Sequence, residues 1–242
     1  MSYLLQQIIN SLGFGSIMAL LAVGYTMTFG LIGLVNFAHG EVFMSGAFAA
    51  YFILTILKLP FWVAILVGIV GSIVIGLVLD RMVFKPVRGI GMNTLFILGL
   101  GASMVLRNST VMLFDARLKG FLVSDFLKGV YILGEVVVFR KTLVIFLTVL
   151  VICIILMYLV KNTKTGIAMR SISYNTQMAQ SLGINTEKII IITFIISSAL
   201  AGFAAALWGY IYGSVHASMG INAVGYAFVA SAIGGVGNIF GA

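Results

Sequence analysis

The sequence predicts an all-α, polytopic integral membrane protein in which residues 1–242 form a single transmembrane domain. Of the 242 residues, 62% are hydrophobic and only 8% are charged. A soluble domain carries about a quarter charged residues because its surface must meet water, so lipid is the solvent that this chain requires. The apolar residues also gather in repeated runs, and most runs approach or exceed the roughly 20 residues that a helix needs to cross a bilayer.

About seven membrane-spanning helices are expected, with a broken or re-entrant segment near residues 33–41. The first apolar run, residues 4–40, is about twice as long as one span, so it cannot be a single straight helix. We expect a helix over residues 4–31 and then a break, where glycines and polar side chains interrupt the run. The later spans are expected at residues 42–57, 61–79, 91–106 or slightly beyond, 142–160, 189–213 and 221–242.

The charges between the runs indicate how the chain crosses the membrane. Residues 80–88 form a short basic gap, and residues 161–188 form a polar segment that begins with Lys and Arg. Cytoplasmic loops carry an excess of these residues, so we expect both segments inside and the N-terminus and residues 114–141 outside. The outer loop also holds several Lys and Arg, so the pattern favours this orientation without fixing it.

The two ends of the chain bear on its processing. No charged residue lies between Met1 and Gly40, so the basic region of a cleavable signal peptide is missing and the first run is expected to stay in the membrane. The last run stops at Gly241 and Ala242, in a glycine-rich stretch without a hydrophilic tail. We therefore expect the chain to be truncated at its C-terminus and to lack one or more further spans.

The break in the first run contains the candidate residues for a solute path, Asn36, His39 and Glu41. Polar and ionisable groups at membrane depth are costly and by default mark a functional site. The neighbouring glycines let the backbone open, and freed carbonyl and amide groups can then line a cavity. The alternative is an ordinary turn at the membrane surface, with Asn36 capping the next helix. Spacing alone leaves both interpretations open.

Residues 166–184 are expected to form a short amphipathic helix on the cytoplasmic side. One face of this helix is largely apolar. Its residues recur at steps of three to four, and they are Ile167, Arg170, Tyr174, Met178 and Leu182. Gly183 is expected to end this helix, and Asn185 to start a new turn before the next span. Such a helix could insert its apolar face into a groove on a partner, or it could lie flat on lipid headgroups.

Small residues recur at helical spacing in the span over residues 189–213. They are Ala201, Ala205, Gly209 and Gly213. Faces of this kind allow helices to approach closely in lipid. The pattern predicts helix packing, with a seam between two subunits as one interpretation.

No constellation for catalysis, metal binding or nucleotide binding is visible in the sequence. His39 and His216 lie far apart, and neither has a Cys or Asp at metal-ligand spacing. The chain has no Gly-Lys pair and so no phosphate-binding loop, which means that any ATP and Mg must be bound by a separate polypeptide. The net charge is +8, but Lys and Arg lie in the gaps between runs, which argues against a nucleic-acid-binding face. We expect neither an enzyme nor a cofactor in this chain.

Three stretches, in order, resemble the permease subunits of branched-chain amino-acid ABC transporters, in particular the H-type subunit. The first is GLVNFAHGEVFMSGAF, which begins at Gly33. The second is GIAMRSISYNTQMAQSLGINTEKIIIITFIISSALAGFAAAL, which begins at Gly166 and looks like the cytoplasmic coupling loop of that family. The third is the glycine-rich AFVASAIGGVGNIFGA at the end. The resemblance covers nearly all of the chain.

The resemblance implies an importer in which two related permeases pair in the membrane, each rests on a cytoplasmic ATPase, and a periplasmic or extracellular binding protein delivers the solute. It places Arg170, Asn175, Ala179 and Gly183 in the coupling segment, residues 161–188. It also implies that the three polar residues of the break lie in or beside the translocation path. The chain would then sit in the cytoplasmic (inner) membrane of a bacterium or archaeon and translocate branched-chain amino acids by alternating access.

Other functions remain open at this point. Urea and short-chain amide permeases are built on similar sequences, so the resemblance is less specific to the solute than to the family. A secondary transporter would need buried acidic residues within its spans, and of the six acids only Glu41 fits. An integral membrane enzyme would need a clustered acid, base or metal site near one interface, and the sequence shows none.

Overall fold

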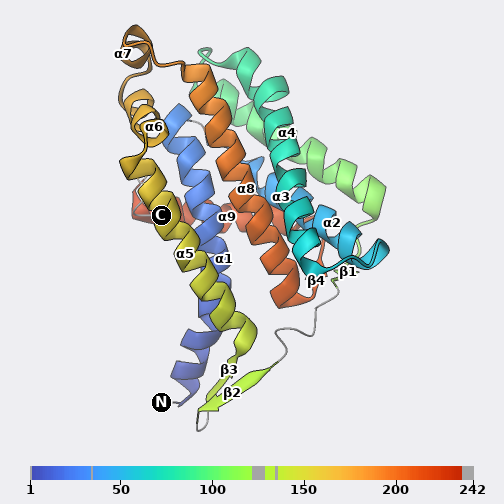
Figure 1. Ribbon diagram of the computed structural model, residues 1–242. Helices are drawn as coiled ribbons and strands as arrows, with labels where there is room; N and C mark the ends of the chain where they lie inside the picture. The colour runs from blue at the N-terminus through green and yellow to red at the C-terminus, as the bar shows by residue number, and fades with distance from the viewer. Residues whose placement is uncertain (1, 34, 122–128, 134–135, 236–242) are drawn as a thin grey trace.

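The computed structural model describes residues 2–33, 35–121, 129–133 and 136–235, which fold into a bundle of apolar helices (Figure 1). In this part of the chain, six helices are long and apolar enough to cross a membrane, and a seventh apolar helix is shorter. The predicted all-α, polytopic membrane fold is therefore confirmed. The glycine-rich stretch from residue 236 onward, on which the expectation of a truncation rests, lies outside the described residues.

The described helices follow one another in the expected order. They are α1 (Ser2–Ile32), α2 (His39–Tyr51), α3 (Phe61–Val78), α4 (Met92–Phe114), α5 (Arg140–Asn162), α6 (Lys164–Tyr174), α7 (Thr176–Ser181), α8 (Thr186–Tyr212) and α9 (Met219–Gly234). The π-helical turns η1 (Phe52–Ile56) and η2 (Leu79–Phe84) extend α2 and α3, and the 3-10 turn η3 (Lys85–Val87) follows. Two short antiparallel pairs complete the structure: β1 (Lys119–Gly120) with β4 (Ser214–Val215), and β2 (Val130–Leu133) with β3 (Val136–Phe139).

The core forms where α8 packs against α1, α2 and α3. Small residues bring these helices together, since a Cβ at Gly202 of α8 would lie only 2.6 Å from the carbonyl oxygen of Gly68 on α3. Ser72 of α3 is fully buried, and its hydroxyl donates to the carbonyl oxygen of Val42 on α2 at 2.8 Å. Close packing of this kind holds helices together in lipid. By contrast, only 11% of the residues in the apolar window of α4 are buried, so α4 is loosely attached.

The two ends of the bundle have different character. At one end, an ion pair between Lys85 of η3 and Glu187 of α8 joins the basic turn after α3 to the start of α8, and α6 and α7 lie at the same end (Figure 1). At the other end, the side chain of Gln6 on α1 bonds the backbone of Val137 in β3, donating at 2.9 Å and accepting at 2.8 Å. The two polar segments expected on one side of the membrane therefore share one end of the molecule.

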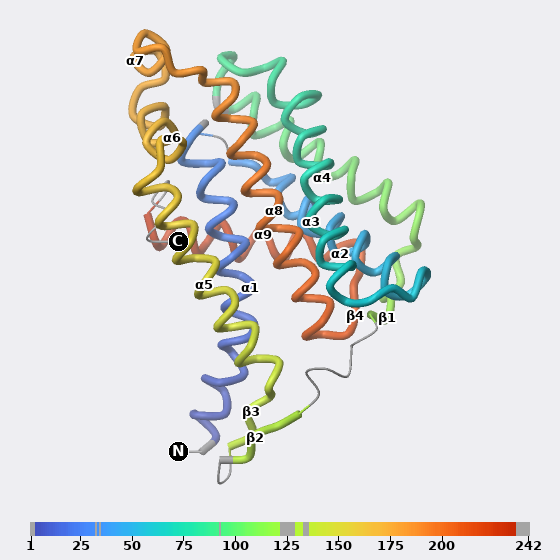
Figure 2. Tube along the Cα trace, viewed as in Figure 1, coloured from blue at the N-terminus to red at the C-terminus, as the bar shows by residue number. Residues whose placement is uncertain are grey.

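The short helix α9 does not run along the bundle. Figure 2 shows its trace lying across the long axis of α1, and the helix packs against α1 and α2. The sequence predicts a span from residue 221 to the end, of which residues 236–242 lie outside the described residues. The described helix is 16 residues long, short of the roughly 20 that cross a bilayer. Hydropathy reports how apolar a segment is but not its direction, which is why this difference could not be foreseen.

Candidate functional site

The break between α1 and α2 forms as predicted. α1 ends at Ile32, Gly33 takes a left-handed backbone with φ of 68°, and α2 begins at His39. The three polar residues singled out in the sequence, Asn36, His39 and Glu41, are each only 1% exposed. The segment is therefore not a turn that sits freely at the membrane surface. It lies inside the bundle, with α1, α4 and α9 around it.

The two ionisable side chains of the break face different neighbours. The His39 ring lies 6.1 Å from the ring of Tyr25 on α1, edge to face. Its Nε2 comes close to Gly24, where a Cβ would lie 3.4 Å from it, and it has no hydrogen-bond partner among the residues that the structure describes. Glu41 instead faces α4, where the Ser103 hydroxyl donates to its Oε1 at 3.1 Å. The two residues are thus close in sequence, but their side chains face different helices, His39 toward α1 and Glu41 toward α4.

Glu41 is only partly satisfied by the residues around it. Its Oε2 is buried and has no hydrogen-bond partner in the described structure, although Arg107 of α4 acts on it through charge. Buried polar atoms without partners are uncommon and call for an explanation. In the lipid-embedded part of a protein, they mark a solute or ion path by default.

Asn36 does not act as the predicted helix cap. The residue at the N-cap of α2 is Ala38, and the N-terminus of α2 has no side-chain cap. The Asn36 backbone carbonyl accepts from the amide of His39 at 3.1 Å, while its side-chain oxygen Oδ1 is buried without a partner. The interpretation of this segment as an ordinary capped turn is therefore wrong, because the Asn36 side chain does not reach the first amides of α2.

The first turns of α2 and α9 cross at two glycines. A Cβ placed on Gly220 would lie 2.5 Å from the carbonyl oxygen of Gly40 and 2.9 Å from Oε2 of Glu41. A Cβ on Gly40 would in turn overlap the carbonyl group of Gly220. The sequence singles out Gly40 as part of the break but gives no sign of its contact with Gly220, because these residues lie far apart in the chain.

Ser103 and Arg107 are functional candidates that the sequence reasoning missed. They lie four residues apart on α4, so they share one face of that helix. A sequence signal for them existed, since an Arg within an apolar span is rare and normally marks a function. The sequence predicts the end of this span at residue 106 or slightly beyond, which puts Arg107 at its edge, whereas α4 continues to Phe114.

The coupling segment consists of two helices where the sequence predicts one. Asn175 takes an extended backbone between α6 and α7, and its side-chain oxygen accepts from the amide of Met178 at 2.9 Å. Gly183, with φ of 81°, ends α7, and Asn185 caps α8 by accepting from the amide of Lys188 at 3.0 Å. The end at Gly183 and the new start at Asn185 agree with the prediction, and the break at Asn175 corrects it.

The two faces of the coupling segment differ sharply in exposure. Met169, Ile172 and Ala179 are at most 6% exposed and pack into the bundle. The apolar residues that the periodicity selected are on the outer face: Ile167, Tyr174, Met178 and Leu182 are exposed by 50%, 91%, 64% and 76%. Arg170 is also exposed, and it donates to the carbonyl oxygen of Lys161 at 3.1 Å. Large apolar side chains that are exposed together on one segment are typical of a contact surface.

The small residues of α8 pack within this chain. Ala201 and Ala205 are fully buried, and Gly209 lies under the ring of Phe121, whose atoms would be 2.6 Å from an added Cβ. Gly213 is the C-cap of α8, in a left-handed backbone with φ of 65°. Ala201 and Ala205 thus lie inside the bundle, Gly209 packs against a side chain outside the helices, and Gly213 ends the helix. The buried positions of Ala201 and Ala205 leave no free surface there for a seam between subunits.

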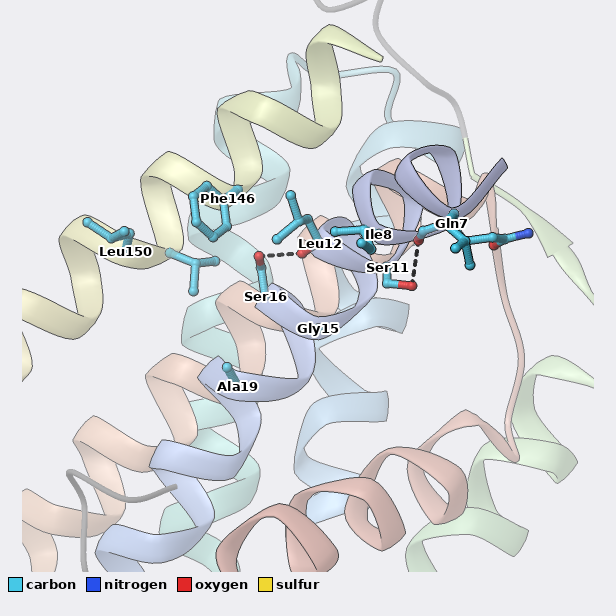
Figure 3. A pocket seen from close by; sticks show the side chains of 11 residues that line it. Gln7, Ile8, Ser11, Leu12, Gly15, Ser16, Ala19, Phe146 and Leu150 are labelled. Atoms are coloured by element: carbon cyan, nitrogen blue, oxygen red, sulfur yellow. Dashed lines mark hydrogen bonds between the residues drawn. The ribbon is translucent and has the colours of Figure 1, made fainter. Parts of the chain in front are cut away.

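A large groove lies away from the break. It has a volume of about 620 Å³ and opens between the first half of α1 and α5, as Figure 3 shows. The hydroxyls of Ser11 and Ser16 in its wall donate to the carbonyl oxygens of Gln7 and Leu12 in their own helix. Since these polar groups are already satisfied, the groove presents a mainly apolar surface and does not look like a polar solute site.

The remaining ionisable groups do not add a metal centre or an acid–base pair. Among the described residues, no group of three or more His, Cys, Asp or Glu could hold a metal ion. Burial lowers the pKa of the His216 imidazole below its ordinary value. Its Nδ1 has no partner, and its backbone carbonyl accepts from the amide of Met219 at the start of α9.

Comparison with known proteins agrees with this architecture. Residues 7–242 match the family described as the permease component of the branched-chain amino acid transport system. The high-affinity branched-chain amino acid transport system permease protein BraD of Pseudomonas aeruginosa is 34% identical, over 98% of this chain and 81% of the relative. LivH of Escherichia coli K12, which carries the same description, is 33% identical over 99% and 82% of the two chains.

An archaeal relative extends the comparison, since a probable branched-chain amino acid transport permease protein LivH of Methanocaldococcus jannaschii is 30% identical over 95% of this chain and 73% of the relative. No solved structure matches the chain significantly. The match to the family covers almost the whole chain, and the break with its buried polar residues and the coupling segment lie within it. The chain therefore belongs to the family of permease components of branched-chain amino acid transport systems.

Proposed function

We propose that this chain is the membrane permease subunit of an ABC importer that translocates branched-chain amino acids across the cytoplasmic membrane by alternating access. Membership in the permease family supports this, as do relatives from two bacteria that are named as high-affinity permeases for these amino acids. The proposal assigns no enzymatic step to this chain. ATP and Mg would be bound by separate ATPase subunits.

The observation that carries the proposal is the exposed apolar face of α6 and α7. Three large apolar side chains of this segment are exposed at the end of the bundle: Tyr174, Met178 and Leu182. The side chains of Met169 and Ile172 are buried and hold the segment against the bundle. Apolar side chains that protrude at this end would be unfavourable in water, and a groove on an ATPase would cover them. A movement of the ATPase subunits would then be transmitted through the buried anchors to α8 and α1.

The remaining parts of the importer are proposed on the same basis. A second, related permease would complete the pore, two ATPase subunits would sit on the cytoplasmic side, and a binding protein would deliver the amino acid from outside. The basic turn after α3 and the coupling segment would face the cytoplasm, which places the N-terminus and the β2–β3 hairpin outside. This orientation follows the excess of Lys and Arg expected on the inner side.

Cysteine crosslinking tests the coupling surface directly. Tyr174→Cys and Met178→Cys, in a Cys153→Ser background, would be co-expressed with the ATPase subunits encoded by the same genome. We expect both to crosslink to an ATPase subunit with a yield that changes when ATP binds. Ala179→Cys is the matched control on the same helix, because Ala179 is only 2% exposed and should crosslink poorly.

Two outcomes would overturn the proposal. If Tyr174→Cys and Met178→Cys formed no crosslink with any ATPase and reacted instead with a reagent outside the cell, the coupling surface and the orientation would both be wrong. Uptake of radiolabelled leucine into vesicles provides the second measurement. Uptake that persists without ATPase subunits and follows an ion gradient would identify a secondary transporter, whereas uptake of urea or a short amide in place of leucine would reassign the solute.

A further inference from the structure

We propose that the amino acid, on its way through the pore that the two permeases form, binds between α2 and α4 of this chain, where Glu41 and Arg107 hold its ammonium and carboxylate groups at a closed site. This inference rests on the proposed function, because it assumes that the solute is an amino acid. It adds a position for the binding site, a pair of residues that binds the two charged groups of the amino acid, and two contacts that close the site on either side.

The first argument is that the two faces of α2 differ in how their polar groups are satisfied. On the face toward α3 and α8, Ser72 is buried and bonded to Val42, and glycines bring the backbones into contact. That face has the features of a permanent structural contact. On the opposite face, Glu41 is equally buried: its Oε1 accepts from Ser103 of α4, while its Oε2, which lies beside Gly220 of α9, has no partner among the described residues. An unsatisfied carboxylate oxygen in an apolar bundle costs stability, so a ligand that supplies the missing donor would explain it.

The second argument is that polar side chains continue along this interface. Ser45 follows Glu41 by one turn of α2, and on α4 Arg107 and Thr110 follow Ser103 at helical spacing. The serine and threonine hydroxyls bond within their own helices, except that of Ser103, which donates to Glu41. A row of polar groups between two helices in the membrane costs free energy, and by default it marks the path of a polar solute.

The charges of this row suit an amino acid. Arg107 acts on the Glu41 carboxylate through charge, yet the two do not form a direct ion pair. A zwitterion placed between them would offer its ammonium to Glu41 and its carboxylate to Arg107. A guanidinium group binds a carboxylate through two parallel hydrogen bonds, and the ammonium would supply the donor that Oε2 lacks. The rings of Phe37 and Phe96 pack against each other further along the same interface and would suit an aliphatic side chain.

Aromatic contacts close the interface on both sides of the polar centre. Toward the end that carries the coupling segment, Phe37 meets Phe96 of α4 with ring centroids 5.2 Å apart. Toward the opposite end, Phe48 of α2 meets Phe114 of α4 at 4.9 Å. Glu41 and Ser103 lie between these two contacts along both helices. Separation of one contact at a time would open the centre to one side only, which is the geometric requirement for alternating access.

α4 is suited to make such a movement. Its membrane-spanning window is only 11% buried, against 67% for the window of α2. Since few contacts attach α4 to the rest of the described structure, a small displacement would separate it from α2 without disturbing the core around α8. Mobile elements are drawn from the weakly packed parts of a protein for this reason.

Thiol accessibility in the assembled importer tests the route. Ser103→Cys, in the Cys153→Ser background, would be reconstituted in proteoliposomes with the partner permease, the ATPases and the binding protein, and treated with a small cationic thiol reagent. We expect the reaction to be at least several-fold faster during ATP turnover than at rest, and saturating leucine to slow it. Ser72→Cys is the matched control, because Ser72 lies on α3 where that helix packs against the closed face of α2, and it should stay unreactive throughout.

The results separate this inference from the proposed function. If wild-type proteoliposomes accumulate leucine while Ser103→Cys stays as unreactive as Ser72→Cys, the α2–α4 route is wrong and the importer stands. If the wild type accumulates no leucine, the proposed function fails and the inference fails with it.

Substitution at the charges provides a second readout. Glu41→Gln and Arg107→Gln should each raise the KM for leucine about tenfold or more, as expected for loss of a charged hydrogen bond. ATP-dependent crosslinking of Met178→Cys should be unchanged in these variants, which shows that they assemble. Glu187→Gln, at an exposed acid outside the route, should leave the KM as it is. Unchanged KM values in Glu41→Gln and Arg107→Gln would overturn the assignment of these residues.

Discussion

At the scale of single residues, the crossing of α2 and α9 depends on two positions that must lack a side chain. Gly40 and Gly220 place their backbones in direct contact, and the Glu41 carboxylate lies beside them. Neither glycine has an unusual backbone conformation in the described structure. Their requirement for glycine is therefore one of space, and any added atom must push the two helices apart.

Substitution of Gly220 tests this requirement. Gly220→Ala should destabilise the protein by about 1–3 kcal/mol, since overpacking of a close contact forces the backbone to shift. The measurement is the midpoint of thermal unfolding in detergent. Gly225→Ala is the matched control on the same helix, because no atom lies within 4 Å of a Cβ at that position. It should be neutral or slightly stabilising, since Ala is favoured over Gly in helices by about 1 kcal/mol. Equal effects of the two changes would contradict the proposed contact.

The same scale shows what could be predicted about the site. Asn36, His39 and Glu41 could be found from the sequence because polar groups stand out inside an apolar run. Their partners could not, since the hydrogen bond from Ser103 to Glu41 joins positions 62 residues apart. Local spacing carries no information about which faces of distant helices meet. Only the three-dimensional arrangement distinguishes the satisfied oxygen of Glu41 from the unsatisfied one.

At the scale of elements, the coupling segment shows why a periodic pattern can hide a break. The apolar residues from Ile167 to Leu182 fit one continuous helix, and each half does follow that pattern. Asn175 interrupts this helix because its side-chain oxygen accepts the hydrogen bond of the Met178 amide. Side chains that bond nearby backbone amides in this way favour the start of a helix over its interior. The pattern therefore predicted the exposed face correctly while missing the turn within it.

Removal of this cap should loosen α7. Asn175→Ala should cost about 1 kcal/mol, the usual effect of losing an N-cap, and should speed hydrogen exchange at the amides of Thr176–Ser181. Asn175→Ser, which keeps a capping oxygen, should retain most of the protection. Exchange that is equally slow in both variants would mean that the rest of the bundle, and not the cap, holds α7 in place.

Two ion pairs at the same end of the bundle should differ in importance. Asp80 is 1% exposed and pairs with Arg88, which is 19% exposed, whereas both Lys85 and Glu187 are about half exposed. Removal of one partner from a buried pair strands the other charge and costs about 3–5 kcal/mol, while exposed pairs contribute little. Asp80→Ala should therefore lower the unfolding midpoint strongly and Lys85→Ala only slightly. Similar midpoints for the two variants would show that water reaches Asp80.

At the scale of the whole molecule, the order of the six long spans could be predicted because each depends on a local property, the length of an apolar run. The direction of α9 depends instead on its packing against α1 and α2, which no local property reports. The same distinction applies to the two ends of the bundle. Charge placed residues 80–88 and 161–188 on one side, and the Lys85–Glu187 ion pair now joins them at one end.

The arrangement of the ends leads to a labelling experiment on the assembled importer in intact cells. Single cysteines at Met82 and Tyr174 lie at the end with the coupling segment, and those at Leu118 and Ile132 lie at the opposite end. All four positions are well exposed, between 68% and 91%. In the Cys153→Ser background, a membrane-impermeant maleimide should label the Leu118 and Ile132 variants from outside. It should reach the Met82 and Tyr174 variants only after the inner face is opened.

The possible deviations from this pattern have distinct meanings. Labelling with the two pairs exchanged would keep the fold and reverse its orientation, so the coupling surface would face away from any ATPase. Labelling of both pairs from one side would contradict the bundle itself, because the six long helices could not then all cross the membrane. The predicted pattern alone places the coupling surface in the cytoplasm and the β2–β3 hairpin where a binding protein can approach it.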